Sequence, residues 1–295
     1  MNSRKKWRIS VFSVCNGVIM ALCCMAVIIP YWDLVMRSIS GQKGAGSLST
    51  MFFPKGFTLG TYMYLFKDDS MIRAFLVTIS RTVAGTMLSL VLTMLAAYPL
   101  SKRDLPLRNL FTIVFLIPMF FSGGLIPSYL LNRSLGLVNN FLVYILPGAV
   151  GVYNTILCRN YLMSIDKALE ESAFIDGAGY GMLLARIVTP LCKPILATLA
   201  LFFAVGQWNA WFDSMIYAQS ENLVVLQLKL RRMMDLTSML EEDIALYMEM
   251  NNISNITTQS MRAATTVVTI LPIVCVYPFI QQYFVKGIMV GSLKG

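Results

Sequence analysis

Six long apolar stretches constrain this chain more than any other feature of its sequence. They lie near residues 11–31, 73–100, 109–131, 138–159, 190–212 and 263–285. A helix needs about 20 predominantly apolar residues to cross a membrane, where it satisfies its own backbone hydrogen bonds. The strands of a membrane barrel would alternate apolar and polar residues, which these stretches do not. The sequence therefore predicts an all-α polytopic membrane protein with six transmembrane helices.

The charge of the chain fits the same class. Only 13% of the residues are charged, whereas a soluble domain has roughly a quarter. The net charge of +9 is explained by the excess of Lys and Arg that membrane proteins carry in cytoplasmic segments, so no nucleic-acid partner is expected. The basic residues gather in 1–10, after the second span, in 160–189 and in the tail. This distribution predicts cytoplasmic termini, with 1–10 as a cytoplasmic segment before an uncleaved first helix.

The sequence shows no energy source of its own. Ion-coupled transporters keep carboxylates or histidines within their helices, but this chain has no histidine, and its acidic residues lie outside the predicted spans. Arg81 is the one clear charge inside a span. A phosphate-binding Gly-x4-Gly-Lys-Ser/Thr motif is also missing. A channel needs no energy source, whereas a pump built from this chain must take it from another protein.

The same inventory argues against an enzyme. An intramembrane enzyme would need a catalytic dyad or a metal cluster within the spans. The six cysteines lie in or at the ends of spans and form no disulfide framework, and the adjacent Cys23 and Cys24 point to different sides of a helix. We therefore expect neither a metal site nor a cofactor in this chain.

The predicted cytoplasmic loop 160–189 has the pattern of two short helices around a glycine turn. Ser164 or Asp166 can cap a helix that includes Glu170 and Glu171. A turn is predicted at 176–179, and a second helix leads to Pro190, which opens the fifth span. Such a knob of two helices suits a groove on a partner protein.

This loop resembles the EAA loop of ABC importer permeases. The resemblance rests on Glu171, Ala173, Gly177, Ile187 and Pro190, which match at the family's spacing. Two residues depart from the pattern, because a serine replaces the first alanine after Glu171 and a threonine replaces the leucine before Pro190. The resemblance implies that the loop docks on an ATPase subunit and couples ATP binding to pore opening. The residues that would carry this coupling are Glu170, Glu171, Ala173, Asp176, Gly177, Ile187 and Pro190.

Nearly the whole chain resembles a permease of the carbohydrate importer family, close to the smaller maltose-importer permease and to the oligosaccharide permeases of Gram-positive bacteria. The resemblance is carried by segments 97–101, 121–127, 135–137, 208–212 and 283–287. It implies a transmembrane domain over 11–295 in a bacterial cell membrane. It also implies a second homologous permease, two ATPase subunits that bind ATP and Mg, an extracellular solute-binding lipoprotein, and a sugar or oligosaccharide substrate.

The residues of the substrate path stay open at this point. Amides beside an indole suit a sugar ring, so Gln207, Trp208 and Asn209 are candidates, although membrane anchoring and helix–helix hydrogen bonding also explain them. Arg81 could select an acidic sugar or have a structural role. A non-sugar substrate such as a peptide or polyamine, and an ATP-independent channel or secondary transporter, are the alternative functions.

Two connections are predicted to be external. Aromatic residues within 33–72 indicate an interfacial helix, whereas the long segment 213–261 has no role that its sequence reveals. The glycines of the last segment, 281–295, argue against a continued helix.

Overall fold

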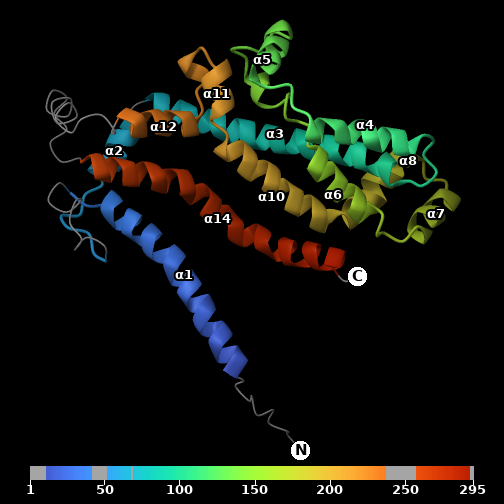
Figure 1. Ribbon diagram of the computed structural model, residues 1–295, viewed down its shortest axis with the longest axis horizontal. Coiled ribbons are helices and arrows are strands. Elements are labelled where there is room, and N and C mark those ends of the chain that lie inside the picture. Colours follow the sequence, from blue (N-terminus) through green and yellow to red (C-terminus); the bar gives the residue numbers. More distant parts are fainter. Residues whose placement is uncertain (1–10, 42–51, 68, 237–256, 293–295) are drawn as a thin grey trace, which may run out of the picture. The chain divides into compact units, whose positions relative to one another are not determined.

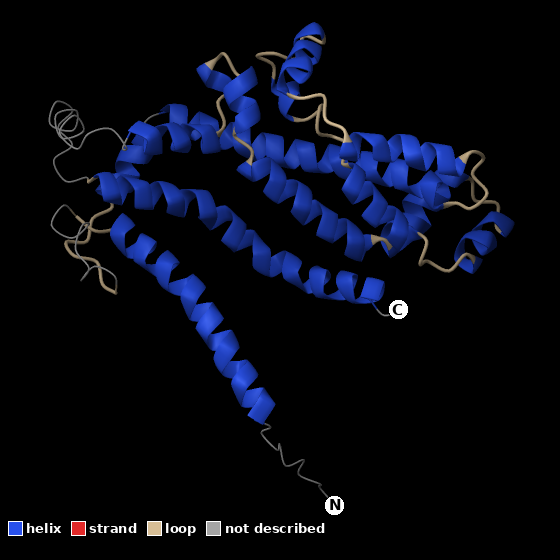
Figure 2. Cartoon of the chain, viewed as in Figure 1, coloured by secondary structure: helices blue, strands red, loops and turns tan. Residues whose placement is uncertain are grey.

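The computed structural model describes residues 11–41, 52–67, 69–236 and 257–292, and its regular elements in these ranges are helices (Figures 1 and 2). One isolated antiparallel bridge joins Ser40 and Phe57. The predicted all-α class is confirmed. The contacts divide the chain into two compact units, Met1–Lys67 with Met233–Ile270 and Asp68–Arg232 with Leu271–Gly295.

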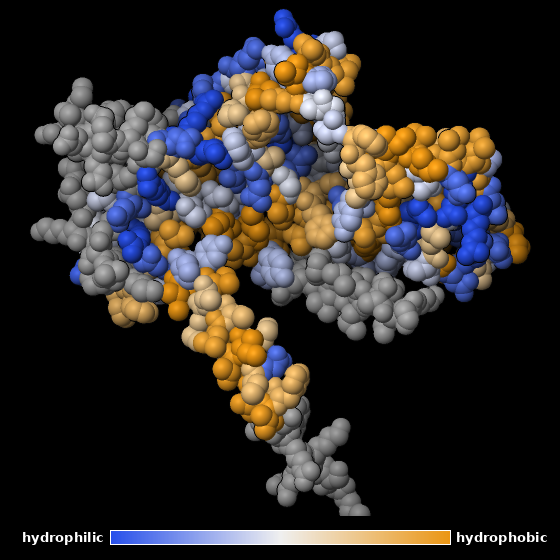
Figure 3. Space-filling view, in the orientation of Figure 1, coloured by the Kyte–Doolittle hydropathy of each residue, from blue (hydrophilic) through white to orange (hydrophobic). Residues whose placement is uncertain are grey.

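The first unit holds α1 (Val11–Ser38), α2 (Gly60–Lys67) and the first part of α14 (Thr258–Ser292). The apolar part of α1 is exposed, as expected for a helix that lipid surrounds (Figure 3). Its end is held by polar contacts, because the Tyr62 hydroxyl of α2 donates to Ser38 Oγ at 2.7 Å. The short α2 lies within 33–72, where the aromatic residues predict an interfacial helix, and its place at a membrane surface stays a prediction.

The second unit is built around α3 (Asp69–Ser101), which packs against α10 (Lys193–Asn209) and α6 (Val152–Leu162). Its other elements are α4 (Arg108–Phe120), α5 (Leu125–Ser134), η2 (Phe141–Tyr144), α6 (Val152–Leu162), α7 (Ala168–Ile175), α8 (Tyr180–Met182), η3 (Leu183–Val188), α9 (Thr189–Leu191), α10 (Lys193–Asn209), α11 (Phe212–Tyr217), η4 (Glu221–Leu223) and most of α12 (Leu226–Leu236).

A stripe of small residues on α3 lets α6 and α10 approach closely. The buried positions of this stripe recur every three or four residues and include Ala74, Thr78, Gly85, Ser89, Thr93 and Ala97. A Cβ on Gly85 would lie 2.8 Å from Nε2 of Gln207, so a larger residue here would force the Gln207 side chain to move. Small residues at such spacing are the usual interface of membrane helices.

The helices long and apolar enough to cross a membrane number three in the described part, and five if each bent pair counts as one span. The sequence predicts six. The third predicted span is broken by 113° between α4 and α5, where Gly124 has φ 82°. The fourth, 138–159, is not one helix: η2 and α6 are separated by a turn segment that contains Pro147 and Gly148. Proline lacks a donor and glycine weakens helices, which explains the interruption.

Two further details differ from expectation. Pro190 lies within α9, and the fifth span bends by 81° at Cys192, before Lys193 begins α10. At the other end, α14 continues to Ser292, so the expectation that the glycines end the helix earlier is wrong. A glycine costs a helix about 1 kcal/mol relative to alanine, which its neighbours can offset.

Candidate coupling site

The first helix of loop 160–189 is α7, and its start and end have identifiable local causes. The Asp166 carboxylate accepts the Ala168 amide at 3.0 Å, which satisfies one free donor at the start. At the end, the Ala178 amide donates to the Ala173 carbonyl at 2.9 Å and the Gly177 amide to the Phe174 carbonyl at 3.0 Å. Gly177 has φ 83°, so these bonds form a Schellman motif with glycine at its left-handed position. The predicted glycine turn is therefore confirmed.

The second helix of the loop is less regular than its sequence predicts. One α-helical turn, α8, continues into the π-helical segment η3. The Thr189 hydroxyl donates to the Leu184 carbonyl at 2.7 Å, five residues earlier, and so adds a second donor to a carbonyl that already accepts the Thr189 amide. Thr189 replaces the leucine of the family pattern, and its hydroxyl has this structural use.

The seven predicted coupling residues divide into an inner and an outer group. Ala173 is buried and Ile187 half-buried, and both pack in a core with Tyr98 of α3 and Leu183 of η3. Glu170 is also directed inward. The outer group is exposed: Glu171, Asp176, Gly177 and Pro190.

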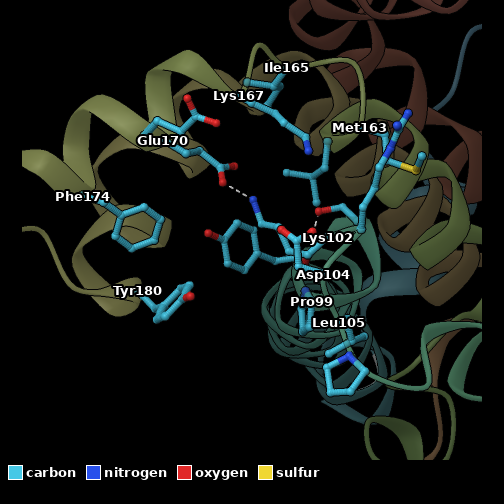
Figure 4. A pocket seen from close by; sticks show the side chains of 16 residues that line it. Pro99, Lys102, Asp104, Leu105, Met163, Ile165, Lys167, Glu170, Phe174 and Tyr180 are labelled. Carbon is cyan, nitrogen blue, oxygen red and sulfur yellow. Dashed lines mark hydrogen bonds and ion pairs between the residues drawn. The ribbon is translucent and has the colours of Figure 1, made fainter.

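An ion pair ties α7 to the end of α3. The Lys102 ammonium, in the first residue after α3, pairs with the Glu170 carboxylate and lies 4.3 Å from the centre of the Tyr98 ring (Figure 4). The side chains are 30% and 17% exposed, so water screens the pair only in part. Sequence reasoning named Glu170 but missed Lys102, whose position in a tight basic loop gives no sign of a partner 68 residues away.

A cavity of about 610 Å³ lies beside this ion pair. The α3–α4 connection lines one side and the coupling loop the other, with Phe174 and Tyr180 packed edge to face at 5.1 Å (Figure 4). Both charge signs are present, since Arg103 and Lys167 line the cavity together with Glu171. Burial raises the pKa of the nearby Tyr161, and its neutral hydroxyl donates to the Leu191 carbonyl at 3.4 Å.

The tip of the loop also exposes large apolar side chains that sequence reasoning did not single out. Ile175, the last residue of α7, is 86% exposed, and Tyr180 is 70% exposed. Exposed apolar groups beside a rigid corner are typical of a protein contact. The pattern Phe174-Ile175 next to the turn was the available signal.

The candidate substrate residues lie on α3 and at the end of α10, and two of them, Arg81 and Gln207, are hydrogen-bonded to each other. The Arg81 guanidinium is buried and donates to both Asp213 carboxylate oxygens, at 3.2 and 2.5 Å, to Gln207 Oε1, at 3.0 and 3.2 Å, and to the Ala210 carbonyl, at 3.2 Å. It also lies 4.6 Å from the centre of the Tyr144 ring. A buried arginine needs such complete pairing.

The remaining two candidates differ in exposure. Trp208 is buried and meets the Phe75 ring edge to face at 5.9 Å, whereas Asn209 is exposed. Sequence reasoning missed Asp213 as the partner of Arg81. The signal was available, because an arginine inside a span requires a counter-charge, and Asp213 is the first acidic residue after the fifth span.

Residues 89–290 match the family described as binding-protein-dependent transport system inner membrane component. The chain is 37% identical to Protein LplC of Bacillus subtilis (strain 168), over 97% of this chain and 95% of that protein. It is 36% identical to the polygalacturonan/rhamnogalacturonan transport system permease protein YtcP of the same organism, over 93% and 94%.

A solved structure is also similar over nearly its whole length. It is a chain of a bacterial ABC transporter involved in the import of the acidic polysaccharide alginate. That chain is 28% identical and superposes with a TM-score of 0.84, covering 96% of this chain and 100% of the other.

Proposed function

The chain belongs to the family of binding-protein-dependent transport system inner membrane components. From the names of its relatives we propose that it takes part in the import of acidic oligosaccharides. It is a membrane-embedded permease subunit of a carbohydrate ABC importer, and a transport subunit rather than an enzyme. In our proposal it forms half of a translocation pore with a second homologous permease. Two ATPase subunits, which bind ATP and Mg, supply energy, and an extracellular binding protein delivers the sugar. Both termini are proposed to face the cytoplasm.

Coupling is proposed to begin at the outer group of loop 160–189. The Schellman corner at Gly177 presents Glu171 and Asp176 together with the exposed Ile175 and Tyr180. An apolar anchor surrounded by charged groups is the usual composition of a protein contact that is buried at its centre. This surface is therefore proposed to enter a cleft of the ATPase subunit.

The inner group is proposed to carry the movement of the loop into the membrane. Ala173 and Ile187 join α7 and η3 to the core around Tyr98, and Glu170 is tied to Lys102. A displacement of α7 thus acts on the end of α3. Because α3 is the helix against which α6 and α10 pack, its movement would change the pore wall.

The acidic class of the substrate is supported by the relatives rather than by Arg81. The YtcP protein is named for polygalacturonan and rhamnogalacturonan, and the similar solved structure for alginate import. The donors of Arg81 already bond to protein acceptors, so a substrate carboxylate is expected to find other cations. One candidate is the exposed Arg231, whose guanidinium carbon lies 3.9 Å from the centre of the Trp211 ring.

The proposal is tested with the purified complex in lipid vesicles. The complex contains this permease, its partner permease, the ATPase subunits and the binding protein. ATP hydrolysis is measured with oligogalacturonate and with a neutral galacto-oligosaccharide of equal length. We expect the acidic sugar to stimulate ATP hydrolysis when the binding protein is present. We also expect uptake of this sugar into vesicles that contain ATP, with the ATPase subunits inside and the binding protein outside. Stimulation by the neutral sugar alone would contradict the acidic class, and sugar flux without any ATPase subunit would contradict the importer.

A further inference from the structure

The coupling loop lies at one end of the second unit. At that end, two arginines, Arg108 and Arg159, have no acidic partner in the described part of the chain. Arg108 is the first residue of α4, and Arg159 lies in the last turn of α6. The Arg108 side chain donates to the Leu100 carbonyl at 3.1 Å and reaches the Met163 sulfur at 3.5 Å. Met163 follows Arg159 by four residues, so the two side chains lie on the same face of the helix. The contact with Met163 therefore places Arg108 on the same surface as Arg159.

The electrostatics of this arginine pair are incomplete without an anion. Arg108 contacts Met163, one turn beyond Arg159, so two positive charges lie on one surface. The Nε atom of Arg159 is buried and has no hydrogen-bond acceptor among the residues that the structure describes. The nearby carboxylate of Glu170 pairs with Lys102 instead. A buried charged donor and a like-charged neighbour together call for an anionic acceptor.

The surroundings of the pair match the rest of a lipid molecule. No residue of α4 is buried, and Figure 3 shows apolar side chains gathered over this helix. The exposed apolar side chains that follow Arg108 are Leu110, Phe111, Ile113, Val114 and Ile117. The first turn of α4 has no acidic residue and no side-chain cap, so its amides add to the positive field. Cations beside an apolar helix at a membrane surface fit a phosphate that carries acyl chains.

We propose that Arg108 and Arg159 together bind the phosphate of an acidic phospholipid of the cytoplasmic leaflet, with its acyl chains along α4. The inference rests on the proposed function for the orientation of this end. The α3–α4 connection that leads to Arg108 also holds Lys102, the partner of the coupling helix. A bound headgroup would therefore steady the connection through which the coupling movement passes.

The test measures lipid retention by native mass spectrometry of the purified importer complex. The probes are phosphatidylglycerol, phosphatidylcholine with the same acyl chains, and inorganic phosphate. We expect phosphatidylglycerol to be retained, and the R108Q/R159Q variant to bind it at least about tenfold more weakly. The matched control, R186Q/K193Q, removes two exposed cations near the same membrane surface and is expected to retain the lipid. The charge-conserving R108K/R159K variant should retain most of it.

Several results would overturn the proposal. Equal loss in R108Q/R159Q and in the control would show unspecific attraction, and equal retention of phosphatidylcholine would show that the charge is irrelevant. Binding of inorganic phosphate with no preference for the lipid would identify a free-anion site. Loss of the ATPase subunit without loss of lipid would assign the arginines to a protein contact. If the double variant does not assemble, R108Q and R159Q are measured singly. Lipid retention needs no transport, so its failure is distinguishable from failure of the proposed function.

Discussion

Removal of the Lys102–Glu170 ion pair should separate ATP hydrolysis from transport. The pair is partly buried and contributes about 1 kcal/mol. The Tyr98 ring under the ammonium adds about 0.5–1 kcal/mol. Lys102→Met keeps most of the side-chain volume but loses both interactions, about 2 kcal/mol together, or roughly 30-fold in the equilibrium between tied and released α7. A released α7 can move on the ATPase subunit without moving α3.

The assay is the ratio of sugar imported to ATP hydrolysed in vesicles that contain the full complex. We expect K102M to lower this ratio about tenfold or more, while ATP hydrolysis remains. E170Q should lower it less, because the contact with Tyr98 survives. The neighbouring exposed cation provides a matched control, R103M, which should leave the ratio near that of the wild type.

A double-mutant cycle decides whether the ion pair itself is responsible. If the two side chains act through each other, K102M/E170Q should be no worse than K102M alone. Strictly additive losses would refute the reasoning, since they would show that Lys102 and Glu170 act on transport by separate routes.

Three further predictions concern packing and backbone. G85A should lower the free energy of unfolding by about 1–3 kcal/mol, because its Cβ would displace Gln207, and G85A/Q207A should be milder in thermal unfolding. D213N should lower the free energy of unfolding by about 3–5 kcal/mol, because it leaves the Arg81 charge unpaired. In the same thermal unfolding assay, D213N/R81M should be more stable than D213N. Equal stability of these two variants would contradict the buried ion pair. G177A should cost about 1–2 kcal/mol at φ 83° and reduce coupled ATP hydrolysis, whereas G177N, which tolerates this backbone region better, should retain more of it.

Local sequence patterns predicted the features that depend on local physics. Apolar length indicated the long helices α1, α3 and α14, and the requirement for positive φ at Gly177 located the turn of the coupling loop. The capping role of Asp166 was one of two options that the sequence left open. Each of these follows from a few adjacent residues.

Tertiary partners were harder to predict because they join distant segments. The pairing of Lys102 with Glu170 and of Arg81 with Asp213 depends on which helix ends meet, and spacing along the chain does not encode this. The fourth apolar stretch, 138–159, had the composition of a span, yet Pro147 and Gly148 lie where its helix is interrupted. The roles assigned to the coupling and substrate residues remain predictions until variants are measured.

The central claim is that the tip of loop 160–189 contacts the ATPase subunit, and photocrosslinking tests it most directly. A photoreactive amino acid at Ile175, which is 86% exposed on α7, is compared with one at Ile113, which is 58% exposed on α4. Our account predicts a crosslink to the ATPase subunit from position 175 and none from position 113. Absence of the crosslink at 175 in an assembled, ATP-hydrolysing complex, or equal yields at the two positions, would contradict it.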